Sequence, residues 1–309
     1  MTIELLRLSG LRIENGRAQG VLDVGGLGAD ARDTLERDVR ARLLAEPGVR
    51  EVRLLLTSER RERRIVAVGS GKGGVGKSTV AANLAVALHR TGTRVGLVDA
   101  DIYGPSQPKL MAAEGVKPEA QDKRLLPVMT PAGVPMLSVG QLVPADRALA
   151  WRGPMASGAL AQLMDGDWSG VDLLVVDLPP GTGDVQLSMI QKYRPTGAVI
   201  VSTPQDLALI DARRAVDLFN TAQVPVIGVV ENMSGYRCPH CGGASDPFGR
   251  GGAETAAGAM GVPLLARVPL DIAIREASDA GTPPAAGNGP EARAFAELAG
   301  AVAAWLEDR

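Results

Sequence analysis

The residues with the clearest chemistry lie in one glycine-rich loop, whose sequence from Gly69 to Thr79 is Gly-Ser-Gly-Lys-Gly-Gly-Val-Gly-Lys-Ser-Thr. An apolar run, 65–68, precedes the loop, and residues 80–88 read as a helix after it. Glycines let backbone N–H groups turn toward an anion, and a helix N-terminus adds partial positive charge. In such a phosphate-binding loop Lys77 reaches the β- and γ-phosphates, while the Ser78 hydroxyl coordinates Mg²⁺. The loop therefore predicts a nucleoside triphosphate site formed by Gly71, Lys72, Gly73, Gly74, Val75, Gly76, Lys77, Ser78 and Thr79.

The same loop also fits a dinucleotide fingerprint. Gly69, Gly71 and Gly74 have the Gly-x-Gly-x-x-Gly spacing, and Asp99 ends the next expected strand, where a ribose-binding acid would lie. That spacing is weak evidence in a chain with 38 glycines. Lys77 and Ser78 have a defined role only in a triphosphate site, so the triphosphate interpretation is favoured.

Acidic residues follow two further apolar segments. Asp177 ends the segment 173–176 and precedes a Pro- and Gly-rich stretch, which predicts a carboxylate in the Mg²⁺ shell. Asp99 and Asp101 follow another expected strand, and one of them is placed to orient an attacking water. The alternative is that these acids only cap turns and helices.

Both cysteines of the chain lie in one motif, Cys238-Pro-His-Cys241. Tetrahedral zinc and a 4Fe–4S cluster each require four ligands, and the motif supplies two thiolates. The count points to two chains that share one metal centre. An iron–sulfur cluster is the favoured occupant, and bridging zinc, a thiol–disulfide pair and unliganded surface cysteines remain as alternatives.

The hydrophobic pattern predicts two domains of an α/β protein. Residues 1–58 form a small α/β domain, 59–64 a charged linker, and 65–309 a doubly wound, mostly parallel sheet with helices on both faces. In the large domain, strands are expected at 65–68, 94–98, 135–139, 172–177, 197–202, 225–230 and 263–267. Helices are expected at 77–90, 155–165, 184–193, 206–219, 251–259 and 290–306.

The charge and the hydrophobic pattern of the chain argue against nucleic acid and membranes as partners. A formal charge of −2 among 309 residues gives no basic field for nucleic acid. No run of 18 apolar residues is present, and the N-terminal residues lack a signal-peptide layout, so we expect a cytoplasmic protein. The last expected helix has an apolar face and a net negative polar face, which favours packing in the core over binding to a membrane.

The loop and four further motifs resemble a known family. Lys72, within Gly-Lys-Gly-Gly-Val-Gly-Lys-Ser-Thr, is the extra lysine of the deviant Walker A loop of dimeric P-loop ATPases. The loop and four further motifs resemble those of the Mrp/ApbC-type iron–sulfur cluster carriers, and the resemblance covers residues 64 to about 285. These four motifs are 99–106, 177–184, 231–234 and 238–241. The segment 1–58 resembles the module often fused ahead of these carriers, without its leading helix and Asp-Pro-Glu segment.

The resemblance implies a function and further roles for residues. Lys72 would reach the phosphates of the partner subunit, Asp101 would take the catalytic switch I position, and Asn232 would hydrogen-bond adenine. A 4Fe–4S cluster would bridge the subunits of a homodimer at Cys238 and Cys241. The expected function is transfer of that cluster to apo-proteins with binding and slow hydrolysis of Mg·ATP, without nucleic acid or membrane. The alternatives are a partition- or positioning-type dimeric ATPase and a zinc-bridged structural dimer.

Overall fold

The computed structural model describes residues 7–14, 16–24, 29–57, 63–142 and 153–309. The chain forms two compact units, one of Met1–Arg63 with Ser169–Asp172 and one of the remaining residues. The expected linker at 59–64 falls largely outside the described residues, and Arg64 is already the first residue of a strand of the larger unit.

The smaller unit is a three-stranded sheet with one helix, in the order β1 (Leu8–Glu14), β2 (Arg17–Asp23), α1 (Ala29–Leu44) and β3 (Glu51–Thr57). Strand β2 lies in the middle, antiparallel to β1 and parallel to β3. Alternate residues of β2 are buried because one face of the sheet packs against α1.

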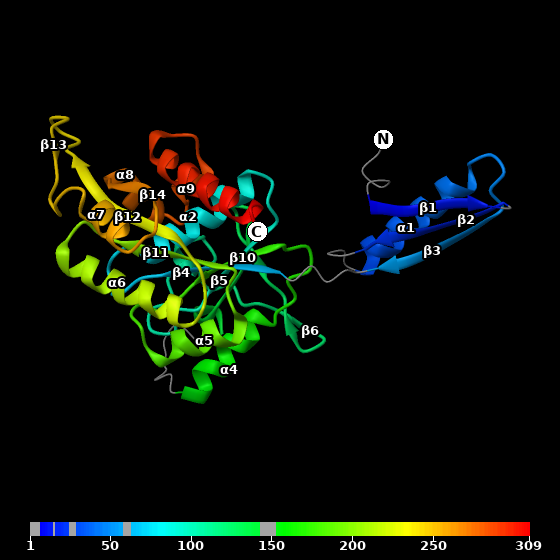
Figure 1. Ribbon diagram of the computed structural model, residues 1–309, viewed down its shortest axis with the longest axis horizontal. Helices are drawn as coiled ribbons and strands as arrows, with labels where there is room; N and C mark the ends of the chain where they lie inside the picture. Colours follow the sequence, from blue (N-terminus) through cyan, green and yellow to red (C-terminus); the bar gives the residue numbers. More distant parts are fainter. Residues whose placement is uncertain (1–6, 15, 25–28, 58–62, 143–152) are drawn as a thin grey trace. The chain divides into compact units, whose positions relative to one another are not determined.

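The larger unit is built on a nine-stranded sheet (Figure 1). The strands pair in the order β13-β12-β11-β4-β10-β5-β9-β8, and β14 also pairs with β12. All pairs are parallel except the two formed by the short strands β13 and β8. The strands are β4 (Arg64–Gly69), β5 (Val95–Asp99), β8 (Val128–Met129), β9 (Pro135–Ser138), β10 (Leu173–Asp177), β11 (Gly197–Ser202), β12 (Val226–Arg237), β13 (Ala244–Ser245) and β14 (Leu264–Leu270).

Helices cover both faces of this sheet. Figure 1 shows α2, α8 and α9 on one face and α4, α5 and α6 on the other. The helices are α2 (Lys77–Arg90), α3 (Gln107–Leu110), α4 (Gly153–Met164), α5 (Asp184–Tyr193), α6 (Asp206–Thr221), α7 (Gly252–Ala259), α8 (Ile272–Asp279) and α9 (Pro290–Glu307). A small hairpin, β6 (Ala120–Gln121) with β7 (Arg124–Leu125), and two short 3-10 turns complete the described elements.

The burial of the central strands fits a parallel sheet that is covered by helices on both faces. Every residue of β5, β10 and β11 is buried, as strands covered on both faces must be. Helix α9 packs its apolar face, including Phe295, Leu298 and Val302, into the same core as α2. The doubly wound α/β fold is therefore confirmed, as is the expected core packing of the last helix. In the part of the chain that the structure describes, no helix has the length and apolarity needed to cross a bilayer.

Candidate functional site

Three parallel strands end side by side at the candidate nucleotide site. Strand β4 leads into the glycine-rich loop, β5 ends at Asp99, and β10 ends at Asp177. In the sheet register Asp177 lies beside Val68 on one side and Asp99 on the other. Parallel pairing thus brings segments about a hundred residues apart to one edge, where open α/β sheets bind ligands.

The glycine-rich loop has the backbone that an anion site needs. Gly74 and Gly76 have φ of 81° and 79°, a left-handed conformation that favours glycine, and α2 begins at the next residue. A Cβ at Gly71 would overlap the backbone carbonyl of Asp211 in α6, and one at Gly76 would overlap the amide of Asn232. At Gly73 and Gly74 no described heavy atom lies within 4 Å of the Cβ position. The loop thus packs closely against α6 and β12 at Gly71 and Gly76, and it is open at Gly73 and Gly74, where phosphates can bind.

Lys77 lies at the centre of the acidic groups. Its ammonium forms an ion pair with Asp177 and lies 3.5 Å from a carboxylate oxygen of Asp101 and 3.3 Å from the hydroxyl of Ser78. Burial by itself lowers the pKa of Lys77, but the charge and hydrogen bond of Asp177, followed by Asp101 and Asp99, raise it above its ordinary value. Lys77 is therefore a buried cation whose charged form these carboxylates stabilise, and phosphate oxygens can contact it as well.

The same donors suit a divalent cation. Ser78, Asp101 and Asp177 each place an oxygen atom against the Lys77 ammonium, so three oxygen groups surround one cation. Hydroxyl and carboxylate oxygens are the ligands that Mg²⁺ prefers. The residues predicted for Mg²⁺, Ser78 and Asp177, thus lie together, with Asp101 beside them.

Asp99 is fully buried behind these residues. It accepts hydrogen bonds from the Ser138 hydroxyl at 2.8 Å and from the backbone N–H groups of Gln107 and Asp101 at 3.1 and 3.2 Å. Burial, and after it the carboxylate of Asp177, raises the pKa of Asp99 to about 7, while the hydrogen bonds from Ser138 and Gln107 and the charge of Lys77 oppose this rise. Asp101 is the more accessible of the two acids, since it is 7% exposed and Asp99 is 0% exposed.

Gln107 is a site residue that the sequence analysis did not identify. Its side-chain amide donates to Asp177 at 2.9 Å and to the Ser78 carbonyl at 3.0 Å, so it joins the two predicted Mg²⁺ ligands. The Oε1 of Gln107 is buried without a described hydrogen-bond partner. Spacing along the chain gives no signal for it, because its role depends on where α3 lies beside Asp177 and Ser78 in the fold.

Asn232 reaches the loop from the far side. It lies in β12, is 7% exposed, and donates from Nδ2 to the Val75 carbonyl at 2.8 Å. Asn232 thus joins the predicted nucleotide site. In the described structure its amide holds the loop.

Lys72 lies in the same loop but outside this cluster. It is half-buried, and its carbonyl accepts a hydrogen bond from the Ser70 hydroxyl at 2.9 Å. Among the described residues, its side chain has no ion-pair partner of its own, in contrast to Lys77.

The two cysteines lie elsewhere, at the tip of the hairpin that joins β12 to β13. Hydrogen bonds of 2.9 Å, from Cys238 N–H to the Gly243 carbonyl and from Gly242 N–H to the Cys238 carbonyl, close this turn. Cys238 is half-buried and Cys241 exposed. Backbone N–H groups of Cys241 and His240, together with the Cys241 thiol, lower the pKa of Cys238.

The two thiols of this hairpin have no further metal-ligating side chains gathered beside them in the part of the chain that the structure describes. Within the described residues, no three or more His, Cys, Asp or Glu side chains gather to hold a metal ion. The hairpin therefore presents two thiols, fewer than the four ligands that tetrahedral zinc or a 4Fe–4S cluster requires.

Comparison with known sequences gives consistent matches. The model for the ParA family, described as NUBPL iron-transfer P-loop NTPase, matches residues 61–303. An "Iron-sulfur cluster carrier protein" of Deinococcus radiodurans is 49% identical over 259 residues, covering 81% of this chain and 73% of the relative. The "Iron-sulfur protein required for NADH dehydrogenase, mitochondrial" of Arabidopsis thaliana is 51% identical over 221 residues, covering 71% and 70%.

Solved structures agree on the fold. A nucleotide-binding protein of Archaeoglobus fulgidus, in complex with ADP, has 37% identity and a TM-score of 0.65 over 75% of this chain and 91% of the other. The cell division ATPase MinD of Pyrococcus furiosus has 26% identity and a TM-score of 0.59 over 79% and 99%.

Proposed function

Since this chain belongs to the ParA family of NUBPL iron-transfer P-loop NTPases, we propose that it is an ATP-dependent carrier that transfers 4Fe–4S clusters to apo-proteins. The observation that carries this proposal is the exposed hairpin with two thiols and no further described ligand. The relatives named as iron–sulfur cluster carriers support it.

The cluster is the cargo, and two chains hold it. Cys238 and Cys241 of each subunit supply two thiolates, so a homodimer supplies the four that a 4Fe–4S cluster requires. Exposure of the hairpin suits delivery, because an acceptor's thiols must reach the iron atoms before the carrier releases them.

The nucleotide site drives or times this transfer by hydrolysing ATP slowly. Lys77 and the loop N–H groups hold the phosphates, Asp101 orients the attacking water, and Lys72 contacts the partner's phosphates. Ser78 and Asp177 would hold Mg²⁺, which when bound neutralises phosphate charge. Asn232 exchanges its contact with the Val75 carbonyl for one with adenine.

We also propose two domains for the chain and the cytoplasm as its compartment. Residues 1–58 form an accessory domain, and the linker predicted at 59–64, whose last residue Arg64 already lies in β4, joins it to the ATPase domain at 65–309. The carrier acts in the cytoplasm on apo iron–sulfur proteins, without nucleic acid or membrane, in keeping with its formal charge of −2.

An oxygen-free transfer assay tests the proposal. Protein loaded with iron and sulfide is mixed with an apo-enzyme whose activity requires a 4Fe–4S cluster, with a thiol chelator that traps free iron. We expect activity to appear with the loaded parent and not with Cys241→Ser. Zinc as the only tightly bound metal would support the structural dimer instead, and a cluster that never leaves would contradict the carrier role.

A further inference from the structure

Strand β12 connects the two candidate sites directly. It carries Asn232 at the glycine-rich loop and ends at Arg237, the residue before Cys238. Between these points the pairing with β14 is irregular, since Asn232 pairs with Val268 and Tyr236 with Leu270. Three residues of β12, 233–235, therefore face one residue of β14. We call these three residues the β12 bulge.

The bulge has an unusual backbone. Met233 has φ of 59° and Gly235 has φ of 72°. A left-handed conformation is rare for a residue such as methionine and persists only where the surroundings impose it. The contacts on both sides of the bulge therefore hold Met233 in this conformation.

One side of the bulge rests on the glycine-rich loop. Asn232 donates to the Val75 carbonyl at 2.8 Å, and the Met233 methyl lies 3.9 Å from where a Cβ at Gly76 would be. A nucleotide that enters the loop and engages Asn232 competes with this carbonyl, so it acts on the residue next to the bulge.

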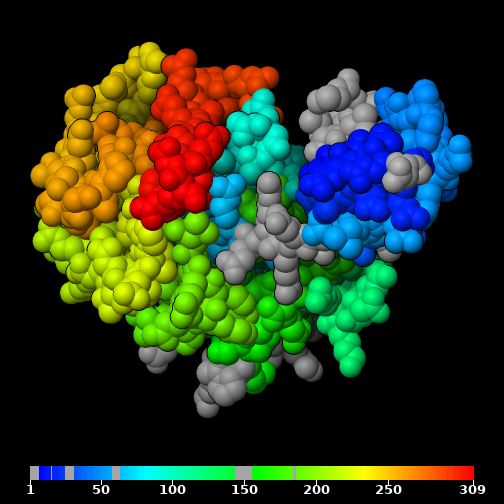
Figure 2. Space-filling view, turned by 45° about the vertical axis from the view of Figure 1, so that its right-hand side comes forward, coloured from blue at the N-terminus to red at the C-terminus, as the bar shows by residue number. Residues whose placement is uncertain are grey.

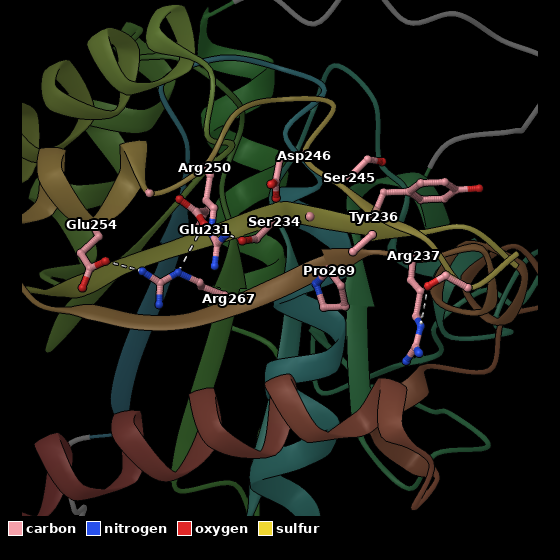
Figure 3. A pocket seen from close by; sticks show the side chains of 14 residues that line it. Glu231, Ser234, Tyr236, Arg237, Ser245, Asp246, Arg250, Glu254, Arg267 and Pro269 are labelled. Atoms are coloured by element: carbon pink, nitrogen blue, oxygen red, sulfur yellow. Dashed lines mark hydrogen bonds and ion pairs between the residues drawn. The ribbon is translucent and has the colours of Figure 1, made fainter.

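The other side is held by a buried carboxylate. Glu231, 1% exposed, accepts a hydrogen bond from the Ser234 hydroxyl at 2.6 Å and one from the Ala253 N–H at the start of α7 at 3.1 Å. Arg267 of β14 lies 3.5 Å from it and also pairs with Glu254. Figure 3 shows Glu231, Ser234 and Arg267 converging, with Tyr236 and Arg237 further along the strand. The hydrogen bond from Ser234 joins the bulge to Glu231. Because Glu231 also contacts Ala253 of α7 and Arg267 of β14, this bond connects the bulge to both elements.

Beyond the bulge, Tyr236 joins the hairpin to the sheet, since it pairs with Leu270 of β14 and with Ser245 of β13. Only Tyr236 and Arg237 of β12 pair with β13 before Cys238. A cavity of about 720 Å³ lies against this segment, lined among others by Ser234, Tyr236 and Ser245. A change at the bulge can thus be passed to the cysteines without disturbing the core.

We propose that Ser234 and Glu231 are positioning residues that, through the β12 bulge, set the cysteine hairpin relative to the nucleotide site. Nucleotide binding at Asn232 then changes the accessibility of Cys238 and Cys241. The proposal rests on the proposed function for the identity of the cargo and for Asn232 as a nucleotide contact. It makes no use of the cluster itself.

Alkylation of the metal-free, reduced full-length protein tests this inference. Because the chain has only two cysteines, the mass of the intact protein reports iodoacetamide reaction at Cys238 and Cys241 alone. We expect saturating Mg·ATP to change the alkylation rate of the parent by about fivefold or more, the lower end of ordinary coupling between sites. Ser234→Ala should bind ATP like the parent but show equal rates with and without it.

Two variants control the assay. Ser234→Thr keeps the hydroxyl and should retain the nucleotide effect, and Ser245→Ala removes an exposed hydroxyl in the same cavity and should leave the effect intact. A parent whose alkylation ignores ATP, or a Ser234→Ala variant with the full effect, would overturn the inference. A protein that never takes up a cluster but shows these rates would refute the carrier function alone.

Discussion

Lys77 is the residue on which the nucleotide site depends most. Its buried ammonium is shared by Asp177, Asp101 and Ser78, and it is the one described cation inside this acidic cluster. In the proposed reaction the same charge stabilises the phosphoryl group as it is transferred. The residue therefore links the local stability of the site to its chemistry.

Replacement of Lys77 by alanine should abolish ATP hydrolysis. Loss of one such electrostatic contact typically lowers turnover by about 100-fold or more. Phosphate release at saturating ATP measures the effect, with Lys109→Ala, at an exposed lysine of α3, as the matched control. Thermal unfolding of both variants separates a catalytic loss from unfolding, and parental turnover in folded Lys77→Ala would rule out this phosphate-binding loop.

Asp99 should give the free energy of unfolding a distinct pH dependence. Its pKa is raised from 3.8 to about 7 in the folded protein. Between these values the folded protein keeps a proton that the unfolded chain releases, so this contribution to stability declines as pH rises from about 4 to about 7. Urea unfolding across this range should show a steeper decline in the parent than in Asp99→Asn, which cannot titrate. Parallel curves would show that Asp99 is ionised throughout.

At the scale of elements, the glycine-rich loop is shaped by its neighbours as much as by its own sequence. Helix α6 touches it at Gly71 through Asp211, and β12 touches it at Gly76 through Asn232. Both contacts require the absence of a Cβ. The loop is thus preformed by packing, which lowers the entropy lost when phosphates bind.

Two neighbouring glycines allow a direct test of this packing. Gly71→Ala puts a methyl group into the backbone of α6 and should lower the free energy of unfolding by about 2 kcal/mol or more, as overpacking does. Gly73→Ala meets open space and should stay close to the parent. Urea unfolding without nucleotide measures both, and equal stability of the two variants would contradict the close contact with α6.

The sequence predicted the regular elements well because buried parallel strands and amphipathic helices leave strong patterns. Most of the main strands and helices of the large unit were expected within a few residues of their observed bounds, but β12 continues to Arg237, seven residues beyond its expected end at 230. The short elements α3, α8, β6, β7, β8 and β13 were missed, since two to eight residues leave little periodicity. Gln107 and Ser138 were missed for a different reason. Their roles depend on where α3 and β9 fold back beside Asp99, which spacing along the chain does not encode.

At the scale of the whole molecule, two groups of the described chain lack the partners that their proposed roles require. The cysteine hairpin supplies two thiols, and Lys72 carries a charge without an ion-pair partner among the described residues. Figure 2 shows one outer face of the molecule, coloured along the chain. In the proposed homodimer, the second copy supplies the other two thiolates and places its own Lys72 at the first copy's nucleotide site.

Lys72→Ala should separate binding of ATP from its turnover. If Lys72 contacts only the partner's phosphates, the variant keeps most of its nucleotide affinity at concentrations where it is monomeric and loses hydrolysis. Equilibrium binding of a fluorescent ATP analogue and phosphate release measure the two effects. Equal loss of both would place Lys72 in its own subunit's site.

The count of iron per dimer tests the central claim most directly. Oxygen-free reconstitution with iron and sulfide, followed by native mass spectrometry and iron analysis, should give one 4Fe–4S cluster per dimer, about four irons for two chains. Cys238→Ser and Cys241→Ser should each remain without the cluster and still bind ATP, because the nucleotide site lies elsewhere. A cluster held by a single chain, or a full cluster in either variant, would contradict a site shared between two subunits.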